Sequence, residues 1–246
     1  MDDEQLLRYS RQIMLPQCGI EGQIRLHQAA VLIVGMGGLG SPVAMYLAAS
    51  GVGELILSDD DQVDLSNLQR QILFTTSDVG RDKVDAARHH LEALNPEIVV
   101  RVYKERLDDD LLAELVHGVD IVVDASDNFT TRFQLNRVCK QQAKPLVSAA
   151  VIRMEGQVSV FRLDRDDSPC YRCLYEDTEE LAETCSETGV MGSVVGIMGS
   201  IQATETIKVL LDIGSPLVGR VMLLDAERME WRTVKLAKDP KCPVCS

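Results

Sequence analysis

Short apolar runs alternate with amphipathic stretches over the first 145 residues of the chain. Each run is five or six residues long, which is typical of a strand buried on both faces, and the stretches between them carry helical spacing. Buried strands joined by helices predict a parallel sheet, in which ligands bind at the carboxyl ends of the strands. The predicted strands are 29–34, 54–58, 98–103 and 120–124, and the predicted helices begin at Ser41 and cover 83–94, 108–117 and 129–141.

The pattern changes after about residue 145, where apolar and polar positions alternate. This alternation predicts strands with one wet face, and therefore an antiparallel part of the sheet. The fold class we expect is α/β, a Rossmann-like mixed sheet with a parallel N-terminal half and antiparallel C-terminal strands. The predicted later strands are 156–162, 218–225 and 229–235.

The length and charge of the chain limit its domains and partners. At 246 residues and without a Pro/Ser-rich linker, we expect one domain with a nucleotide-binding half at about 1–150 and a second half at about 151–246. The net charge of −13 disfavours nucleic acid and anionic membranes as partners. The N-terminus lacks signal-peptide features, so we expect a cytoplasmic protein. The apolar stretch 190–213 carries Glu205 and Lys208, which favours a buried helix over a membrane span.

A glycine-rich loop follows the first predicted strand. Its glycines would let backbone N–H groups approach a phosphate, and the helix that opens at Ser41 adds partial positive charge. Asp59 ends the second predicted strand, about 20 residues after the loop, where it can accept hydrogen bonds from ribose hydroxyls. The pattern predicts a nucleotide site rather than a structural turn. The glycines are Gly35, Gly37, Gly38 and Gly40.

The polar segment 64–71 and a lysine downstream indicate which nucleotide binds. Arg70 can form paired hydrogen bonds to phosphate oxygens, and Lys83 can act as a point charge on a neighbouring phosphate. A dehydrogenase does not need two cations and an amide aimed at phosphates, so the pattern favours ATP. The candidate contacts here are Ser66, Asn67, Leu68, Gln69, Arg70 and Lys83.

Asp127 follows the fourth predicted strand and is the carboxylate that we expect to bind Mg²⁺, beside Asn128 as another nucleotide contact. Its alternative role is N-cap of the following helix, and the two roles can coexist. The ion would act with Arg70 and Lys83 to stabilise charge that develops when a nucleophile attacks the α-phosphorus. Asp127, Arg70 and Lys83 are therefore candidate catalytic residues.

Two Cys-x-x-Cys pairs predict a metal site. Cys170 and Cys173 form the first pair, and Cys242 and Cys245 form the second. Four thiolates fit a closed tetrahedral zinc site, whereas the alternative of redox pairs or disulfides suits a cytosol less well. With all four positions filled by thiolates, the zinc would be structural and would attach the C-terminus to the body of the fold.

Three further cysteines and four histidines have weaker signals. Cys18 and Cys139 lie among apolar neighbours and are expected to pack in the core. Cys185 lies in the polar, acidic stretch 175–189 and is a candidate nucleophilic thiol, although its acidic neighbours disfavour the thiolate. We expect surface or capping roles for His27, His89, His90 and His117.

Taken in order, these motifs resemble the MoeB/ThiF family, the ubiquitin-activating-enzyme-like adenylyltransferases of bacteria. The resemblance covers essentially the whole chain and includes both cysteine pairs. It implies that the C-terminal Gly-Gly carboxylate of a small ubiquitin-like sulfur carrier attacks the ATP α-phosphate, giving carrier adenylate and pyrophosphate. The other segments that carry the resemblance are 8–13, 35–40, 65–71, 124–128, 153–157 and 189–191.

The resemblance also implies roles for individual positions and partners. Arg11 would reach the active site of the other subunit of a homodimer, and the family's structural zinc maps onto the four paired cysteines. The carrier would lie over the later strands, with its tail under the loop 175–189, and a separate protein would donate sulfur. Nucleotide contacts are implied for Gly38, Asp59, Asn67, Arg70, Lys83 and Asp127.

Two branches of the family match parts of the chain. The segment 153–157 resembles the molybdopterin branch, whose carrier is the small subunit of molybdopterin synthase, whereas 59–61 and 71–76 resemble the thiamine branch. We favour the molybdopterin branch. Two other classes stay open: an NAD-dependent oxidoreductase, which would leave the two cations and the zinc without a role, and a non-catalytic adaptor that docks a carrier, which would not need an intact site.

Overall fold

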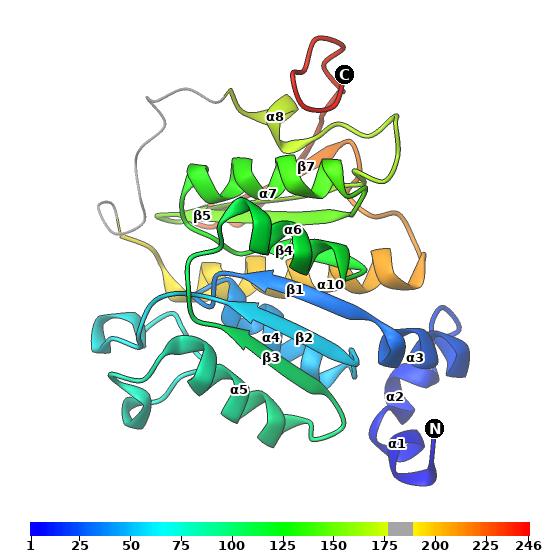
Figure 1. Ribbon diagram of the computed structural model, residues 1–246, viewed down its shortest axis with the longest axis vertical. Coiled ribbons are helices and arrows are strands. Elements are labelled where there is room, and N and C mark those ends of the chain that lie inside the picture. The colour runs from blue at the N-terminus through cyan, green and yellow to red at the C-terminus, as the bar shows by residue number, and fades with distance from the viewer. Residues whose placement is uncertain (177–188) are drawn as a thin grey trace.

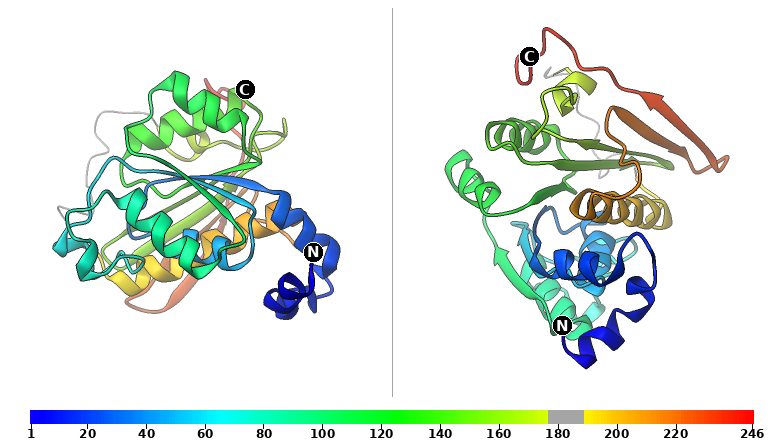
Figure 2. Two further views of the ribbon diagram at one scale, coloured as in Figure 1. Left: turned by 60° about the horizontal axis from the view of Figure 1, so that its bottom comes forward. Right: turned by 90° about the vertical axis from the view of Figure 1, so that its right-hand side faces the viewer.

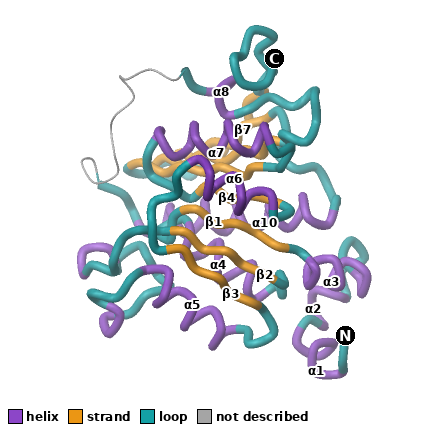
Figure 3. Tube along the Cα trace, in the orientation of Figure 1, coloured by secondary structure: helices purple, strands orange, loops and turns teal. Residues whose placement is uncertain are grey.

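The computed structural model describes residues 1–176 and 189–246, which form a mixed sheet between two layers of helices (Figures 1 and 2). The strands are β1 (Ala30–Val34), β2 (Glu54–Ser58), β3 (Val99–Tyr103), β4 (Ile121–Asp124), β5 (Leu146–Ile152), β6 (Glu155–Phe161), β7 (Arg220–Asp225) and β8 (Glu230–Lys235). The helices are α1 (Asp3–Arg8), α2 (Ser10–Ile13), α3 (Gly19–Gln28), α4 (Gly40–Ala49), α5 (Lys83–Leu94), α6 (Asp109–His117), α7 (Phe129–Gln141), α8 (Tyr171–Leu174) and α10 (Gly192–Leu211), with 3-10 turns η1 (Leu65–Asn67) and η2 (Thr76–Asp78). Figure 3 shows how helices and strands alternate along the chain.

The sheet is eight-stranded in the order β3-β2-β1-β4-β5-β6-β7-β8, and the strands from β3 to β5 in that order are parallel. Val34, the last residue of β1, is in register with Ser58 at the end of β2 and with Asp124 at the end of β4. The loops that follow these three strands therefore begin side by side at one edge of the sheet. The predicted parallel half is confirmed.

The direction of the strands changes at β5, a strand that the sequence pattern did not predict. β5 is parallel to β4 on one side and antiparallel to β6 on the other. A tight turn through Arg153, whose φ is 54°, connects β5 to β6. β6, β7 and β8 then follow as antiparallel neighbours, which confirms the predicted antiparallel strands.

Each face of the sheet has its own hydrophobic core and its own helices (Figure 2). α4, α5 and α10 cover one face, where Val43, Val84 and Met198 belong to one buried cluster. α6 and α7 cover the other face, where Leu112 and Phe133 belong to the second cluster. Burial on both faces explains the continuous apolar runs of β1, β2 and β4.

The apolar helix α10 is long and apolar enough to cross a membrane by length and composition. In this fold it packs against β5, β6 and α4, which confirms the predicted buried helix. Its Glu205 is 4% exposed and accepts hydrogen bonds from Lys208 and from the backbone N–H of Leu217. A Cβ at Gly199 would lie 2.5 Å from Pro42 of α4, so this glycine is required by close helix packing within the chain.

Candidate active site

A cavity of about 400 Å³ lies at the carboxyl ends of β1, β2 and β4. The glycine loop after β1, the acidic turn after β2 and the loop after β4 line it, because the register of the sheet brings them to the same edge. The segment 105–107 after β3 and the apolar side chains of Leu112 and Leu135 also line it. The cavity lies where the sequence predicts a nucleotide.

The four glycines of the loop have two different roles. Gly37 and Gly38 line the cavity, as does Gly35, whose φ is 94°. A Cβ at Gly35 would lie 2.6 Å from the carbonyl oxygen of Ala125, and one at Gly40 would lie 2.0 Å from the carbonyl oxygen of Gly35. Gly40 is not among the described residues that line the cavity. It allows α4 to begin directly against the loop.

Lys83, the first residue of α5, contacts the acidic turn after β2. Its Nζ lies 2.7 Å from Asp61 and 3.5 Å from Asp59, and the lysine is only 4% exposed. Asp59 also accepts hydrogen bonds from the backbone N–H groups of Met36 and Asp61, at 2.7 and 2.9 Å. Burial raises the pKa of Asp59, and Lys83 and these N–H groups oppose the rise. Asp60, between these two carboxylates along the chain, is exposed.

This arrangement determines which ligand groups suit each part of the cavity. Two carboxylates share one ammonium, so the corner around Asp59 favours hydroxyl donors such as those of ribose over a phosphate. Lys83 can contact a phosphate by leaving Asp61, whose side chain is 71% exposed and can return to solvent.

Arg70 and Asn67 are held together at the cavity wall. Nη2 of Arg70 donates to Oδ1 of Asn67 at 2.9 Å, and Nη1 donates to the carbonyl oxygen of Ser66 at 3.2 Å. Both Arg70 and Asn67 line the cavity, whereas the neighbouring candidates Ser66, Leu68 and Gln69 do not line it within the described part of the chain. The prediction of nucleotide contacts at those three positions gains no support from the cavity geometry.

Asp127 lies exposed in the loop after β4, and its alternative role as N-cap is wrong. The N-cap of α7 is Asn128, whose side chain accepts a hydrogen bond from the N–H of Thr131 at 2.9 Å. Asn128 also donates a long hydrogen bond of 3.4 Å to the Asp127 carboxylate. Capping is therefore done by the neighbour, and the carboxylate of Asp127 is available at the cavity wall.

Arg132 supports this loop from behind and was not among the candidates from the sequence. It is 8% exposed, its Nη2 donates to the carbonyl oxygen of Ser126 at 2.8 Å, and its Nε lies 4.0 Å from the Asp124 carboxylate. Asp124 is fully buried and accepts hydrogen bonds from Ser126 and Ser148. A sequence signal existed: the arginine lies one helical turn into α7, directly behind the loop.

A second cavity, of about 660 Å³, adjoins the first. It extends over the antiparallel strands, with Gln157 and Leu223 in its wall, and the hydroxyl of Tyr175 donates to Gln157 at 2.7 Å. Of the described residues, Asp127, Arg132 and Val151 line both cavities. A ligand group that enters along the second cavity would therefore meet the contents of the first beside Asp127.

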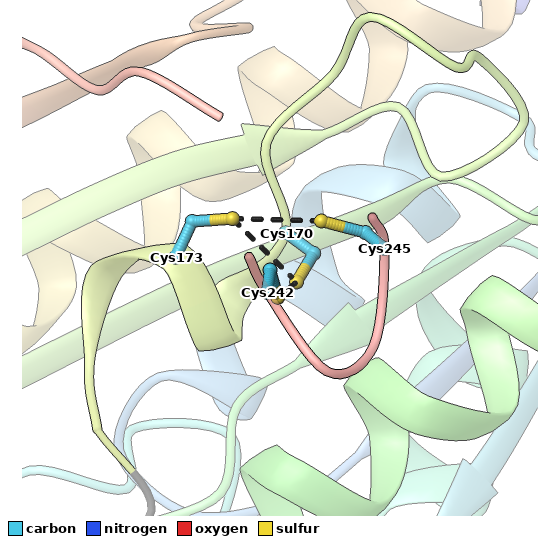
Figure 4. Close-up of side chains that lie close together, drawn as sticks. All are labelled: Cys170, Cys173, Cys242 and Cys245. Atoms are coloured by element: carbon cyan, nitrogen blue, oxygen red, sulfur yellow. Dashed lines mark hydrogen bonds between the residues drawn. The ribbon is translucent and has the colours of Figure 1, made fainter. Parts of the chain in front are cut away.

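The four paired cysteines converge where the C-terminal segment meets α8 (Figure 4). The Sγ atoms of Cys170 and Cys242 are 3.6 Å apart, those of Cys173 and Cys245 are 3.5 Å apart, and those of Cys170 and Cys173 are 4.0 Å apart. Tetrahedral zinc with Zn–S bonds of about 2.3 Å requires S···S distances of about 3.8 Å. These separations fit zinc and are too long for a disulfide.

The remaining candidates lie away from both cavities or outside the described residues. Cys18 and Cys139 are buried packing residues, as predicted. His90 is half-buried and its Nε2 lies 2.7 Å from the buried carboxylate of Asp78, whereas the other three histidines are exposed. Arg11 is exposed on α2. Cys185 lies outside the described residues.

The fold and the cavity at the carboxyl ends of its parallel strands define the class of this protein as a Rossmann-like α/β protein with a nucleotide-type site. The family model of the ThiF family matches residues 9–244. The chain belongs to the ThiF family.

Several known proteins resemble the chain over its whole length. It is 46% identical over 245 residues to a molybdopterin-synthase adenylyltransferase of Salmonella typhimurium, covering 100% of this chain and 98% of that protein. It is 44% identical over 245 residues to a sulfur carrier protein ThiS adenylyltransferase of Escherichia coli, covering 100% and 97%. Among solved structures, Escherichia coli MccB with ATP has a TM-score of 0.84 at 26% identity, covering 97% of this chain and 73% of that one.

Proposed function

We propose that this protein adenylylates the C-terminal Gly-Gly carboxylate of a small ubiquitin-like sulfur carrier, giving carrier adenylate and pyrophosphate. The observation that carries the proposal is the shared wall of the two cavities at Asp127, Arg132 and Val151. One cavity has the loop and cations for a triphosphate, and the other is a groove over the later strands. Two of the relatives above are named adenylyltransferases, one of molybdopterin synthase and the other of the sulfur carrier protein ThiS.

The reaction needs two anions to meet. An oxygen of the carrier carboxylate forms a bond to the α-phosphorus, the bond from phosphorus to the bridging oxygen breaks, and its electron pair leaves with pyrophosphate. Arg70 and Lys83 would lower the repulsion at the phosphates, and Arg132 would add positive charge at the junction of the two cavities. Asp127 would hold a Mg²⁺ ion, which neutralises phosphate charge when bound.

The chemistry assigns the glycine loop to the phosphates and Asp59 to the ribose. The bent loop leaves Gly37 and Gly38 at the wall of the nucleotide cavity, where a backbone can approach an anion closely. Asp59 lies at the corner where hydroxyl donors are favoured.

The later strands offer a docking surface for the carrier. All six residues of β8 are exposed, including Trp231 and Val234 at 44% each. The groove at their end holds Glu155, Arg228 and other charged side chains along its wall. A folded carrier on this face would send its flexible tail along the groove toward Asp127.

The zinc, the dimer and the sulfur donor complete the proposal. Zinc on the four cysteines would attach the C-terminus to α8 and take no part in the reaction, because thiolates fill every position. A homodimer would bring Arg11 of one subunit to the active site of the other. A separate cytoplasmic protein would supply sulfur to the adenylate, with release of AMP.

The other function classes fit the site less well. An NAD-dependent oxidoreductase has no use for Lys83 and Arg70 at the cavity wall or for an adjoining groove. An adaptor without activity has no reason to keep Asp127 where the two cavities meet.

ATP-pyrophosphate exchange tests the proposal and chooses the branch. The purified enzyme is assayed with Mg²⁺ and, separately, with the small subunit of molybdopterin synthase and with the thiamine sulfur carrier. Exchange with the first carrier alone is the expected result, and exchange with both would make the enzyme a shared activator. If neither carrier supports exchange while ATP binds, adenylylation of these carriers is refuted.

A further inference from the structure

Gln71 has a buried side chain that the described structure leaves without hydrogen bonds. It follows Arg70, is 4% exposed, and lines the nucleotide cavity. Its Oε1 is buried without a partner, whereas its Nε2 is not fully buried and donates to no described residue. Nε2 lies 3.7 Å from the position that a Cβ would take at Gly37, which places the amide against the phosphate loop.

The backbone around Gln71 is fixed, so the unpaired amide is not a consequence of a loose loop. The N–H of Gln71 donates to the carbonyl oxygen of Asn67 at 3.0 Å, and the carbonyl oxygen of Gln71 accepts from the N–H of Phe74 at 3.1 Å. A buried amide without partners destabilises the protein relative to an apolar side chain of the same shape. Such a group is expected to find its partner in a ligand.

Two other buried glutamines show what a structural amide looks like in this fold. Gln23 is fully buried, donates to the carbonyl oxygen of Ser50 at 3.0 Å and accepts from Gln12 at 2.6 Å. Gln202 is fully buried and its Nε2 donates to two backbone carbonyl oxygens, at 2.7 and 3.0 Å, although its Oε1, like that of Gln71, has no partner among the described residues. Gln71 differs from both because its Nε2 donates to no described residue.

We propose that Gln71 is a further ligand of the ATP triphosphate, with its side-chain N–H donating to a phosphate oxygen held at Gly37. The inference rests on the proposed function, since it places ATP in this cavity. The amide adds a neutral donor between the cation of Arg70 and the backbone N–H groups of the loop. A phosphate oxygen at this position would give Nε2 of Gln71 the acceptor that no described residue supplies.

The test separates ATP affinity from the stability of the fold, because Gln71→Leu should lower the affinity without lowering the stability. Gln71→Leu should raise or preserve the melting temperature of the nucleotide-free enzyme, yet increase the Kd for ATP by about tenfold or more in calorimetry without carrier. Gln71→Glu should weaken ATP binding further, because its carboxylate repels phosphate. Both effects should persist with ADP and shrink with AMP, which lacks the outer phosphates.

Gln23→Leu is the matched control, since it removes a bonded amide far from the cavity. It should lower the melting temperature and leave the Kd for ATP unchanged. The proposal is overturned if Gln71→Leu binds ATP like the wild type, or if Gln23→Leu loses the same affinity. Should Gln71→Leu fail to fold, Gln71→Glu decides alone, and unchanged ATP affinity there overturns the proposal. The assay measures ATP binding without carrier, so it is independent of whether exchange occurs.

Discussion

Arg132 and Asp124 form a buried ion pair directly behind the loop that carries Asp127. Arg132→Met would keep most of the side-chain volume but leave the fully buried Asp124 carboxylate without its cation. At 4.0 Å, and with an effective dielectric constant of about 20, the Coulomb attraction between the two charges is about 4 kcal/mol before the cost of desolvation. Loss of one partner from a buried pair costs about 3–5 kcal/mol by mutation. The hydrogen bonds that Asp124 keeps from Ser126 and Ser148 favour the lower part of this range.

Urea unfolding followed by circular dichroism measures this loss. Arg132→Met should lower the free energy of unfolding by about 3–4 kcal/mol with an unchanged m-value. Arg137→Met on the same helix is the control, because its ion pair with Asp109 is exposed and is worth less than about 1 kcal/mol. If the two variants lose the same free energy, the buried pair does not stabilise the loop as we infer.

Four other substitutions test the active site, the zinc site, the role of Cys185 and the pH dependence of stability. Asp127→Ala should abolish ATP-pyrophosphate exchange and leave the melting temperature unchanged, and wild-type turnover would remove its catalytic role. Cys173→Ser should lower the zinc content measured by mass spectrometry and the melting temperature, because the ion holds the C-terminal segment; full stability without metal would contradict a structural zinc. Cys185→Ala should leave carrier adenylation near the wild-type rate, and its loss would give the thiol a role in that step. Burial alone would raise the pKa of Asp78, but hydrogen bonds from His90 and Thr75 outweigh it and hold that pKa below its ordinary value. This stability is present above the unfolded pKa of about 3.9 and is lost as pH falls through the folded pKa, so Asp78→Asn should flatten the acid side of the stability curve.

Local sequence patterns determined most of the secondary structure. The predicted helices 83–94 and 129–141 and the predicted strand 54–58 match the observed bounds of α5, α7 and β2. Helical periodicity and a following Asn-Pro or polar break act over a few residues, so they can be read without tertiary information. The paired cysteines are equally local, because their spacing alone predicts four thiolates for one tetrahedral ion.

The sequence pattern did not predict which strands lie beside one another in the sheet. The run 146–152 is as apolar as the earlier strands, yet it was not predicted as β5, the strand where the sheet changes from parallel to antiparallel. Its neighbour β4 is separated from it along the chain, and its neighbour β6 follows after a turn through Arg153. Which strand lies beside which depends on the whole sheet.

The tertiary structure also decided which polar side chains meet. Sequence spacing placed Asp59 and Lys83 in the same half of the chain, but the contact between them depends on the fold bringing α5 to the end of β2. The tertiary structure also made Asn128, and not Asp127, the N-cap of α7. It left Oε1 of Gln71 without a partner at the cavity. The sequence by itself determined which groups the chain carries and the order of its elements. Which groups share one cavity was decided only when a sheet of distant strands brought their carboxyl ends into register, because hydrogen bonds between strands act across the chain.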